Sequence, residues 1–344
     1  MNTINSLFIY ITFKCNLRCC HCWASCDSNV VENHLTINTM IATIKNAYSL
    51  GMRSLKITGG EPFVYKEEII QIFDYLLDFP DINIRMETNG TLLDDSLIER
   101  INAQNVALSV SLHDFRSEMH DKFVGQPGAF LKVVHVLPKI KIKEVLVTVS
   151  KQNIEEIEKI FDLLHSLGVK KIKLNILLKV GRATMLENME LSVEDYKRLN
   201  DVIDKYIVHH DDIQIDSSTP LCIGSLSIHR PKHELAVGCS FGKVCCIVPN
   251  GDITMCGWSI NSDNSQLKLG NIFDESLDVI WRRSSEIVNQ IYPITGVCSK
   301  CIVGKICNGG CRAISYLTYG ELNAPYPVCQ TMFESGVFPK NRLI

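Results

Sequence analysis

The chain has 344 residues, 46% of them hydrophobic, which is enough to bury the core of one large domain and a smaller one. Its 35 lysines and arginines nearly balance 38 acidic residues, so the formal net charge of -3 does not favour binding to a nucleic acid or an anionic membrane. No apolar run approaches the roughly 20 residues that cross a bilayer, and no export signal precedes the first strand. We therefore predict a cytoplasmic protein.

The cysteines are the most unusual feature of the composition. There are 15 of them, five between Cys15 and Cys26 and ten between Cys222 and Cys329. So many cysteines would suggest disulfides in a short secreted chain, but in a longer chain without an export signal metal binding explains them better. The gap between the two groups indicates two separate metal regions.

The cysteine-free middle of the chain alternates β-rich runs with helical patterns, which is typical of a parallel sheet built from strand–helix units. The apolar stripe of Ile154–Leu167, closed by Gly168, is one of the helices. Six units predict an α/β fold, a partial (β/α)6 barrel of the TIM type. The expected strands are Leu7–Phe13, Ser54–Thr58, Asn83–Glu87, Val106–Ser111, Glu144–Val149 and Lys171–Leu177.

The pattern changes after a helix expected at Val193–Ile207. The polar stretch His209–Pro220 marks a junction, and beyond it short strands surround turns such as the one at Pro249–Asp252. We assign residues 1–208 to the barrel, 209–221 to the junction and 222–344 to a small cysteine-rich domain. Metal, more than a large apolar core, is expected to hold this second domain together.

A C-x3-C-x2-C motif, formed by Cys15, Cys19 and Cys22, directly follows the first strand. Three thiolates can hold three irons of a 4Fe-4S cubane, whereas four are needed to close it. The open iron can then chelate the amino and carboxylate groups of a ligand and deliver an electron to it. On spacing alone, the alternatives are a zinc site or a cluster closed by Cys20 or Cys26.

Three further motifs end neighbouring strands. Gly59-Gly60-Glu61-Pro62 ends the second strand, where paired glycines allow close backbone approach and Glu61 could accept a hydrogen bond from an amine. Glu87-Thr88-Asn89-Gly90 follows the third strand, and Ser109-Val110-Ser111 lies on the fourth. Together with the cysteine motif, these residues resemble the radical S-adenosylmethionine (SAM) superfamily.

The resemblance implies the ligands of the first cluster and the contacts of SAM. Members of the superfamily split SAM into methionine and a 5′-deoxyadenosyl radical, which removes a hydrogen atom from the substrate. Two positions depart from the usual pattern: His113-Asp114 stands where Asp-Gly is common, and Val124 where an arginine is common. By resemblance, the cluster is held by Cys15, Cys19 and Cys22, adenine contacts His21, the methionine amino end lies at Gly59, Gly60, Glu61 and Pro62, and the ribose or carboxylate lies near Asn89 and Ser111.

The order of the C-terminal cysteines resembles the SPASM domain, which carries auxiliary clusters in a subset of radical SAM enzymes. Gly270-Asn271-Ile272 and Gly181-Arg182-Ala183 extend the resemblance over nearly the whole chain. Two structural zinc sites are the alternative. The resemblance implies two auxiliary 4Fe-4S clusters, the first with Cys239, Cys256 and Cys311, and the second with Cys298, Cys301, Cys307 and Cys329.

The fourth ligand of the first auxiliary cluster is left open by this comparison. Cys245 is our candidate, with Cys246 and Cys222 as competitors, and the cluster could also keep an open iron. Cys222 has a second interpretation, because a thiol near the barrel mouth could return a hydrogen atom to a substrate radical, as an epimerase requires. A buried cysteine without a ligand is otherwise a small hydrophobic residue.

The resemblance therefore implies an enzyme with SAM, three 4Fe-4S clusters and an external electron donor such as a flavodoxin or ferredoxin. Its leading substrate is a ribosomally synthesised precursor peptide, which would be crosslinked, epimerised or oxidised. Because the first strand begins near Leu7, leader recognition is left to a separate protein or to the barrel itself. The alternatives are a small-molecule substrate, such as a sugar or a tetrapyrrole, and a non-catalytic iron–sulfur electron carrier or zinc scaffold.

Overall fold

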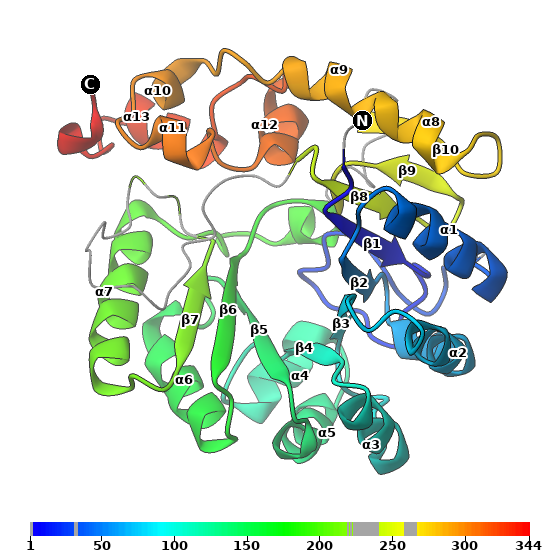
Figure 1. Ribbon diagram of the computed structural model, residues 1–344. Coiled ribbons are helices and arrows are strands. Elements are labelled where there is room, and N and C mark those ends of the chain that lie inside the picture. Colours follow the sequence, from blue (N-terminus) through cyan, green and yellow to red (C-terminus); the bar gives the residue numbers. More distant parts are fainter. Residues whose placement is uncertain (1–2, 31–33, 219, 221, 223–240, 258–266) are drawn as a thin grey trace.

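The computed structural model describes residues 3–30, 34–218, 220, 222, 241–257 and 267–344 (Figure 1). Its centre is one ten-stranded sheet in the order β10-β9-β8-β1-β2-β3-β4-β5-β6-β7, parallel from β8 to β7 and antiparallel at β9 and β10. The strands are β1 Ser6–Tyr10, β2 Ser54–Thr58, β3 Asn83–Thr88, β4 Ala107–Ser111, β5 Lys143–Val149, β6 Lys171–Ile176, β7 Gln214–Ser217, β8 Val244–Ile247, β9 Asp252–Thr254 and β10 Lys268–Asn271.

Helices cover the outer face of the curved sheet (Figure 1). Their starts follow local sequence: Thr36 and Asp94 accept backbone N–H groups at two N-termini, and Ser192 forms a reciprocal capping box with Asp195. The helices of the barrel are α1 Ile37–Ser49, α2 Lys66–Leu76, α3 Asp95–Ala103, α4 Ser117–Val124, α5 Ala129–Val136, α6 Ile157–Ser166 and α7 Val193–His209.

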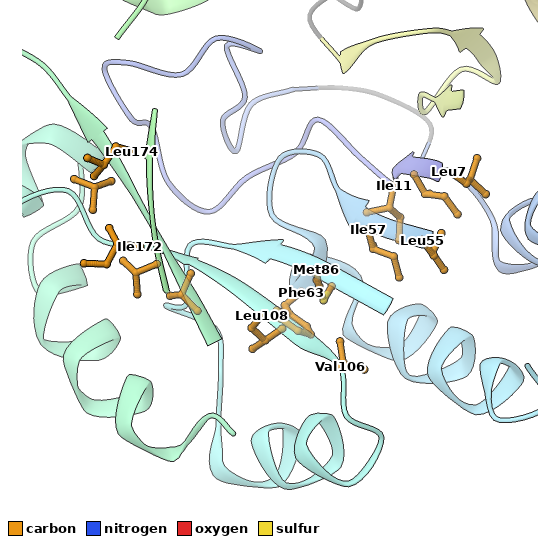
Figure 2. Packing of buried hydrophobic residues seen from close by; sticks show 14 of the residues in the cluster. Leu7, Ile11, Leu55, Ile57, Phe63, Met86, Val106, Leu108, Ile172 and Leu174 are labelled. Atoms are coloured by element: carbon orange, nitrogen blue, oxygen red, sulfur yellow. The ribbon is translucent and has the colours of Figure 1, made fainter. Parts of the chain in front are cut away.

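The strands present an apolar face to the helices and a polar face to the barrel interior. Figure 2 shows Ile57, Met86 and Leu108 on neighbouring strands, all fully buried among the side chains that join the sheet to its helices. The alternate positions, on the opposite face, carry Lys56, Glu87 and Ser109. Apolar and polar residues therefore alternate along these strands in the sequence, and the polar ones lie inside the barrel.

The fold confirms the predicted α/β barrel with its six strand–helix units. The expected helix at Ile154–Leu167 begins as a 3-10 turn, Ile154–Glu156, and continues as α6. The sheet, however, extends past the expected junction, because β7 lies within residues 209–221 and β8 pairs with β1 from the C-terminal side. Strands from both sides of that junction thus form one sheet.

The C-terminal region is small and helical, and it lies across one end of the barrel (Figure 1). Its own apolar cluster is built around Val297, Val303, Met332 and Phe338, together with cysteine side chains. No helix within the described residues is both long and apolar enough to span a membrane. The helices here are α8 Leu277–Arg282, α9 Ser284–Asn289, α10 Gly296–Ser299, α11 Gly304–Cys307, α12 Arg312–Tyr319 and α13 Pro327–Glu334.

The sheet-to-helix interface can be tested at Ile57. Ile57→Ala removes a fully buried side chain from a central strand, so we expect the free energy of unfolding to fall by about 2–5 kcal/mol in denaturant titration. Leu131→Ala is the control, because Leu131 is 67% exposed on α5 and its loss should change stability by less than about 0.5 kcal/mol. Equal effects of the two substitutions would contradict this assignment of the core.

Candidate active site

The segment with Cys15, Cys19 and Cys22 leaves the carboxyl end of β1 and is held by backbone hydrogen bonds from other parts of the barrel. The N–H of Cys15 donates to the Asp27 carbonyl at 3.0 Å, and the N–H of Cys20 donates to the Phe123 carbonyl at 2.9 Å. The N–H of Arg18 also donates to the carbonyl of Val124, the last residue of α4, at 3.2 Å. The loop that carries Cys15, Cys19 and Cys22, the cysteine loop, is therefore held in place by backbone contacts with the rest of the barrel.

The three thiols share an apolar environment, in which Leu17, Val124 and Ala129 are buried. Burial raises the pKa of Cys15 to about 12 and that of Cys19 well above its usual value. A metal centre would supply the positive charge that makes such thiols bind as thiolates. One buried and two partly buried thiols from one loop suit a three-ligand 4Fe-4S cluster, with Val124 as part of its apolar wall.

Cys20 and Cys26, the alternative closing ligands, lie in different places. Cys20 packs with Phe123, Leu177 and Ala183, whereas Cys26 belongs to the apolar cluster of Cys15. A hydrogen bond from the Cys26 side chain lowers the pKa of Cys22 to about 6. Cys26 is therefore the nearer alternative ligand, and Cys20 points into a separate apolar cluster.

The Glu61 carboxylate connects the loops that follow β2 and β3. It is fully buried, and it accepts hydrogen bonds from the Asn89 N–H at 2.8 Å, the Thr88 hydroxyl at 2.8 Å and the Phe63 N–H at 3.2 Å. Burial nonetheless raises its pKa to about 7. Protein donors thus occupy the carboxylate that we expected to accept from an amine, and buried Pro62 begins the 3-10 turn Pro62–Tyr65 beside it.

The paired glycines are required by the neighbouring backbone. A Cβ at Gly59, whose φ is +134°, would lie 2.3 Å from the Thr12 carbonyl oxygen, and one at Gly60 would lie 2.2 Å from that of Lys14. The N–H of Gly60 donates to the Thr12 carbonyl at 2.7 Å. The two glycines therefore allow close approach of the chain segment that leads into the cysteine loop. This contact fixes the distance between the glycine motif and the cysteine motif.

Asn89 lies beside the first cysteine of the motif. Its amide nitrogen is 3.9 Å from the Cys15 sulfur and donates to the Asn16 side-chain oxygen at 2.9 Å. Ser111 is the partly buried last residue of β4. The structure thus brings Asn89 directly to the cysteine motif and leaves Ser111 at the carboxyl end of a strand farther along the sheet.

His21 lies within the cysteine motif, and its ring packs against aromatic residues of the barrel. Its ring stacks on Phe123 with centroids 4.2 Å apart and meets the His113 ring edge-on at 4.5 Å. Burial lowers the pKa of His21 to about 3, so the ring is neutral at physiological pH. Its Nδ1 is buried and has no hydrogen-bond partner among the described residues, which leaves a polar atom for a ligand to satisfy.

Arg182, to which the sequence motif gave no role, binds the backbone of the cysteine loop. Its guanidinium donates to the carbonyls of Cys19 and Cys26, both at 2.7 Å, and its N–H donates to the Cys22 carbonyl at 3.0 Å. Gly181 precedes it because a Cβ there would lie 2.1 Å from the Trp23 carbonyl oxygen. An arginine after a glycine near the end of a strand was the available signal, but its partners could be found only in the tertiary structure.

The structure also gathers all four predicted ligands of the second auxiliary cluster. Cys222 joins them, and its sulfur lies 3.5 Å from that of Cys329. The pKa of Cys307 rises to about 11, by burial and then by the other thiols. The group is Cys222, Cys298, Cys301, Cys307 and Cys329.

The predicted ligands of the first auxiliary cluster are less completely placed. Cys239 lies outside the described residues, while Cys311 precedes α12 near Tyr326. Cys245 is buried on the helix-facing side of β8, whereas Cys246 shares the interior face with Tyr10. Burial and then the nearby Cys246 thiol raise the pKa of Tyr10, and Cys256 contributes as well. Cys246 and Cys256 thus both lie within electrostatic reach of Tyr10, and the identity of the fourth ligand stays a prediction.

Comparison with known proteins decides the family. The family model described as the radical SAM superfamily matches residues 9–179, and the SPASM model, an iron-sulfur cluster-binding domain, matches residues 239–302. An AdoMet-dependent heme synthase of Methanosarcina barkeri is 30% identical over 93% of this chain and 94% of its own length. The chain belongs to the radical SAM superfamily.

Two other proteins show how widely this radical SAM architecture is shared. An Fe-coproporphyrin III synthase of Methanosarcina barkeri is 27% identical over 93% of this chain and 86% of its own length. The crystal structure of Streptococcus suis SuiB bound to the precursor peptide SuiA has a TM-score of 0.76 at 19% identity, covering 96% of this chain and 76% of SuiB. The protein is therefore a radical SAM/SPASM enzyme, and its SuiB likeness is one of fold.

Arg182 should position the cysteine loop. Arg182→Met removes two charge-assisted hydrogen bonds to loop carbonyls, each of which contributes about 1.5–3 kcal/mol. We expect at least about a tenfold fall in 5′-deoxyadenosine formation and a loss of iron from the first cluster. Arg198→Met is the control, since Arg198 lies on the exposed face of α7. Wild-type cleavage and iron content in Arg182→Met would contradict this role.

Cys222 can be tested as a ligand against its interpretation as a hydrogen donor. Three cubanes give about twelve irons per wild-type chain. Because Cys222 lies beside Cys329, we expect Cys222→Ala to lose iron, with Cys20→Ala as the control that keeps it. Lost product with intact iron and continued SAM cleavage would instead support a hydrogen donor, and unchanged iron and product would reject both roles.

Proposed function

We propose that this radical SAM/SPASM enzyme oxidises a side chain of a tetrapyrrole. The observation that carries the proposal is the heme synthase similarity, which extends over 93% of this chain and 94% of that protein. The Fe-coproporphyrin III synthase extends the same similarity to a second protein named for a tetrapyrrole. This substrate was one of the alternatives predicted from the sequence, and the comparisons favour it over a peptide.

Residues of this chain would prepare the first half of the reaction. With SAM and the first cluster bound, the cofactors supply a 5′-deoxyadenosyl radical that can remove a substrate hydrogen atom. Cys15, Cys19 and Cys22 would hold the cluster, and Val124 would help to exclude water from it. Arg182 and the Gly59-Gly60 turn keep the cysteine loop in register with the neighbouring strands. Asn89 lies beside Cys15, at the edge where SAM would bind.

The second half of the reaction needs an electron acceptor. Removal of a hydrogen atom from a carboxylate-bearing side chain leaves one unpaired electron on carbon. Loss of carbon dioxide and of one electron then gives a carbon–carbon double bond, so atoms and charge balance if an auxiliary cluster takes the electron. The C-terminal thiol group would hold such a cluster, and an external flavodoxin or ferredoxin would supply the electron that starts each turnover.

A precursor peptide is the second candidate substrate. It rests on the fold shared with SuiB, which was crystallised with its precursor peptide. A peptide product would be crosslinked, epimerised or oxidised, and a separate leader-recognition protein could take part. SuiB is 19% identical to this chain, compared with 30% for the heme synthase. A likeness at 19% identity supports the fold alone, so the peptide is the second candidate.

The central test compares the anaerobically reconstituted enzyme with a variant that lacks all three cysteines of the first motif. With SAM, a strong reductant and iron coproporphyrin III, the wild type should form 5′-deoxyadenosine and a decarboxylated tetrapyrrole, measured by mass spectrometry. The Cys15→Ala, Cys19→Ala, Cys22→Ala variant should form neither while keeping its auxiliary iron. SAM cleavage by that variant would refute radical SAM chemistry at this motif, and unchanged tetrapyrrole in the wild type would refute the proposed substrate.

A further inference from the structure

Among the residues that the structure describes, the interior face of the barrel carries cations that form no ion pair. Lys56, Arg85 and Lys173 occupy alternate positions of β2, β3 and β6, opposite in phase to the buried Ile57, Met86 and Leu174. Lys56 and Arg85 are register partners on adjacent strands. The cations therefore come from strands that are far apart in sequence but face one common interior.

Each interior carboxylate already has a partner. Glu87 accepts from the Lys56 ammonium at 2.9 Å and from the Thr58 hydroxyl at 2.9 Å. Glu144 accepts from the Ser109 hydroxyl at 2.9 Å, and Lys171 lies 3.4 Å from Glu144. Lys171 also lies 3.5 Å from Asp216. The interior acids are thus committed to protein groups.

Two of the cations have no such partner. Within the ranges that the structure describes, no carboxylate lies within ion-pairing distance of Lys173 or Arg85. Lys173 is partly buried, and burial followed by the charge of Lys56 lowers its pKa. Glu87 and Glu144 attract the Lys173 ammonium from beyond ion-pairing distance, but burial and the nearby cations outweigh them, so a bound anion would relieve the repulsion and supply the unmade hydrogen bonds.

The unpaired cations lie on the same interior face as a path of side chains that leads to the cysteine motif. Glu87 is within electrostatic reach of both Lys173 and Tyr10, and the Tyr10 ring meets that of Trp23, one residue after Cys22, with centroids 6.1 Å apart. A molecule that carries an anion to Lys173 and Arg85 would lie on the interior face that also holds Glu87 and Tyr10, and this face leads to the cysteine motif. A tetrapyrrole with carboxylate side chains is such a molecule.

We propose that Lys173 and Arg85 bind a carboxylate of the substrate and so orient the tetrapyrrole in the barrel. This inference rests on the proposed function and adds to it the two side chains that select an anionic substrate. Arg85 is exposed and offers a planar fork of donors, while Lys173 provides a point charge deeper in the protein. Lys56 stays paired with Glu87 and holds that carboxylate in place.

The test is equilibrium binding of iron coproporphyrin III to the anaerobic holoenzyme, followed by the absorbance of the tetrapyrrole. Lys173→Met and Arg85→Met should each weaken binding by about tenfold or more, since each removes a charge-assisted hydrogen bond. Lys197→Met, a change on the exposed face of α7, is the matched control and should bind as the wild type does. Lys173→Arg, which retains the charge, should recover much of the affinity.

The methyl ester of the same tetrapyrrole separates the charge effect from misfolding. The ester lacks carboxylates, so the wild type should bind it about tenfold or more weakly than the acid, and the Met variants should bind it as the wild type does. The inference would be overturned if the wild type bound acid and ester equally. It would also be overturned if both Met variants bound the acid as tightly as the wild type does. Either result would leave the proposed function standing. If the wild type binds neither form, the proposed function itself fails.

Discussion

Close backbone packing between the cysteine loop and the turn after β2 is the constraint on which the rest of the site depends. The Thr12 and Lys14 carbonyls come so near to Gly59 and Gly60 that a single methyl group would collide with them. The same carbonyls accept hydrogen bonds from the turn. The loop with three thiols is therefore placed by the sheet, and a cluster would bind a preformed arrangement more readily than a flexible one.

The two faces of the barrel strands differ in polarity. The apolar positions of the strands face the helices, and the interior positions carry lysine, arginine, glutamate and serine side chains. A barrel filled with branched apolar residues would leave no polar contacts for a substrate. Here the polar interior includes Glu87, whose charge acts on Tyr10, and the Tyr10 ring in turn meets that of Trp23, next to Cys22. The helix-facing side of the strands thus stabilises the fold, and the interior side carries the polar groups that the proposed substrate would contact.

The C-terminal region depends on long-range contacts of a different kind. Its apolar cluster is small, and five thiols from Cys222 to Cys329 take part in it. A metal centre bound by these thiols would add to the order of this region, whose other buried apolar side chains, such as Leu277 and Trp281, belong to the main core. The pairing of β8 with β1 attaches this region to the barrel through backbone hydrogen bonds. An electron acceptor held there would be joined rigidly to the site of hydrogen abstraction.

The sequence by itself determined the strand–helix alternation and the motifs that identify the superfamily, because both depend on local periodicity and spacing. It also placed Cys15, Asn89 and Glu61 at strand ends. Tertiary structure alone decided that Glu61 binds Asn89, that Arg182 holds the carbonyls of the cysteine loop, and that Cys222 lies beside Cys329. Each of these contacts joins residues at least 28 positions apart, and their meeting depends on how the strands order and curve, which no local pattern encodes.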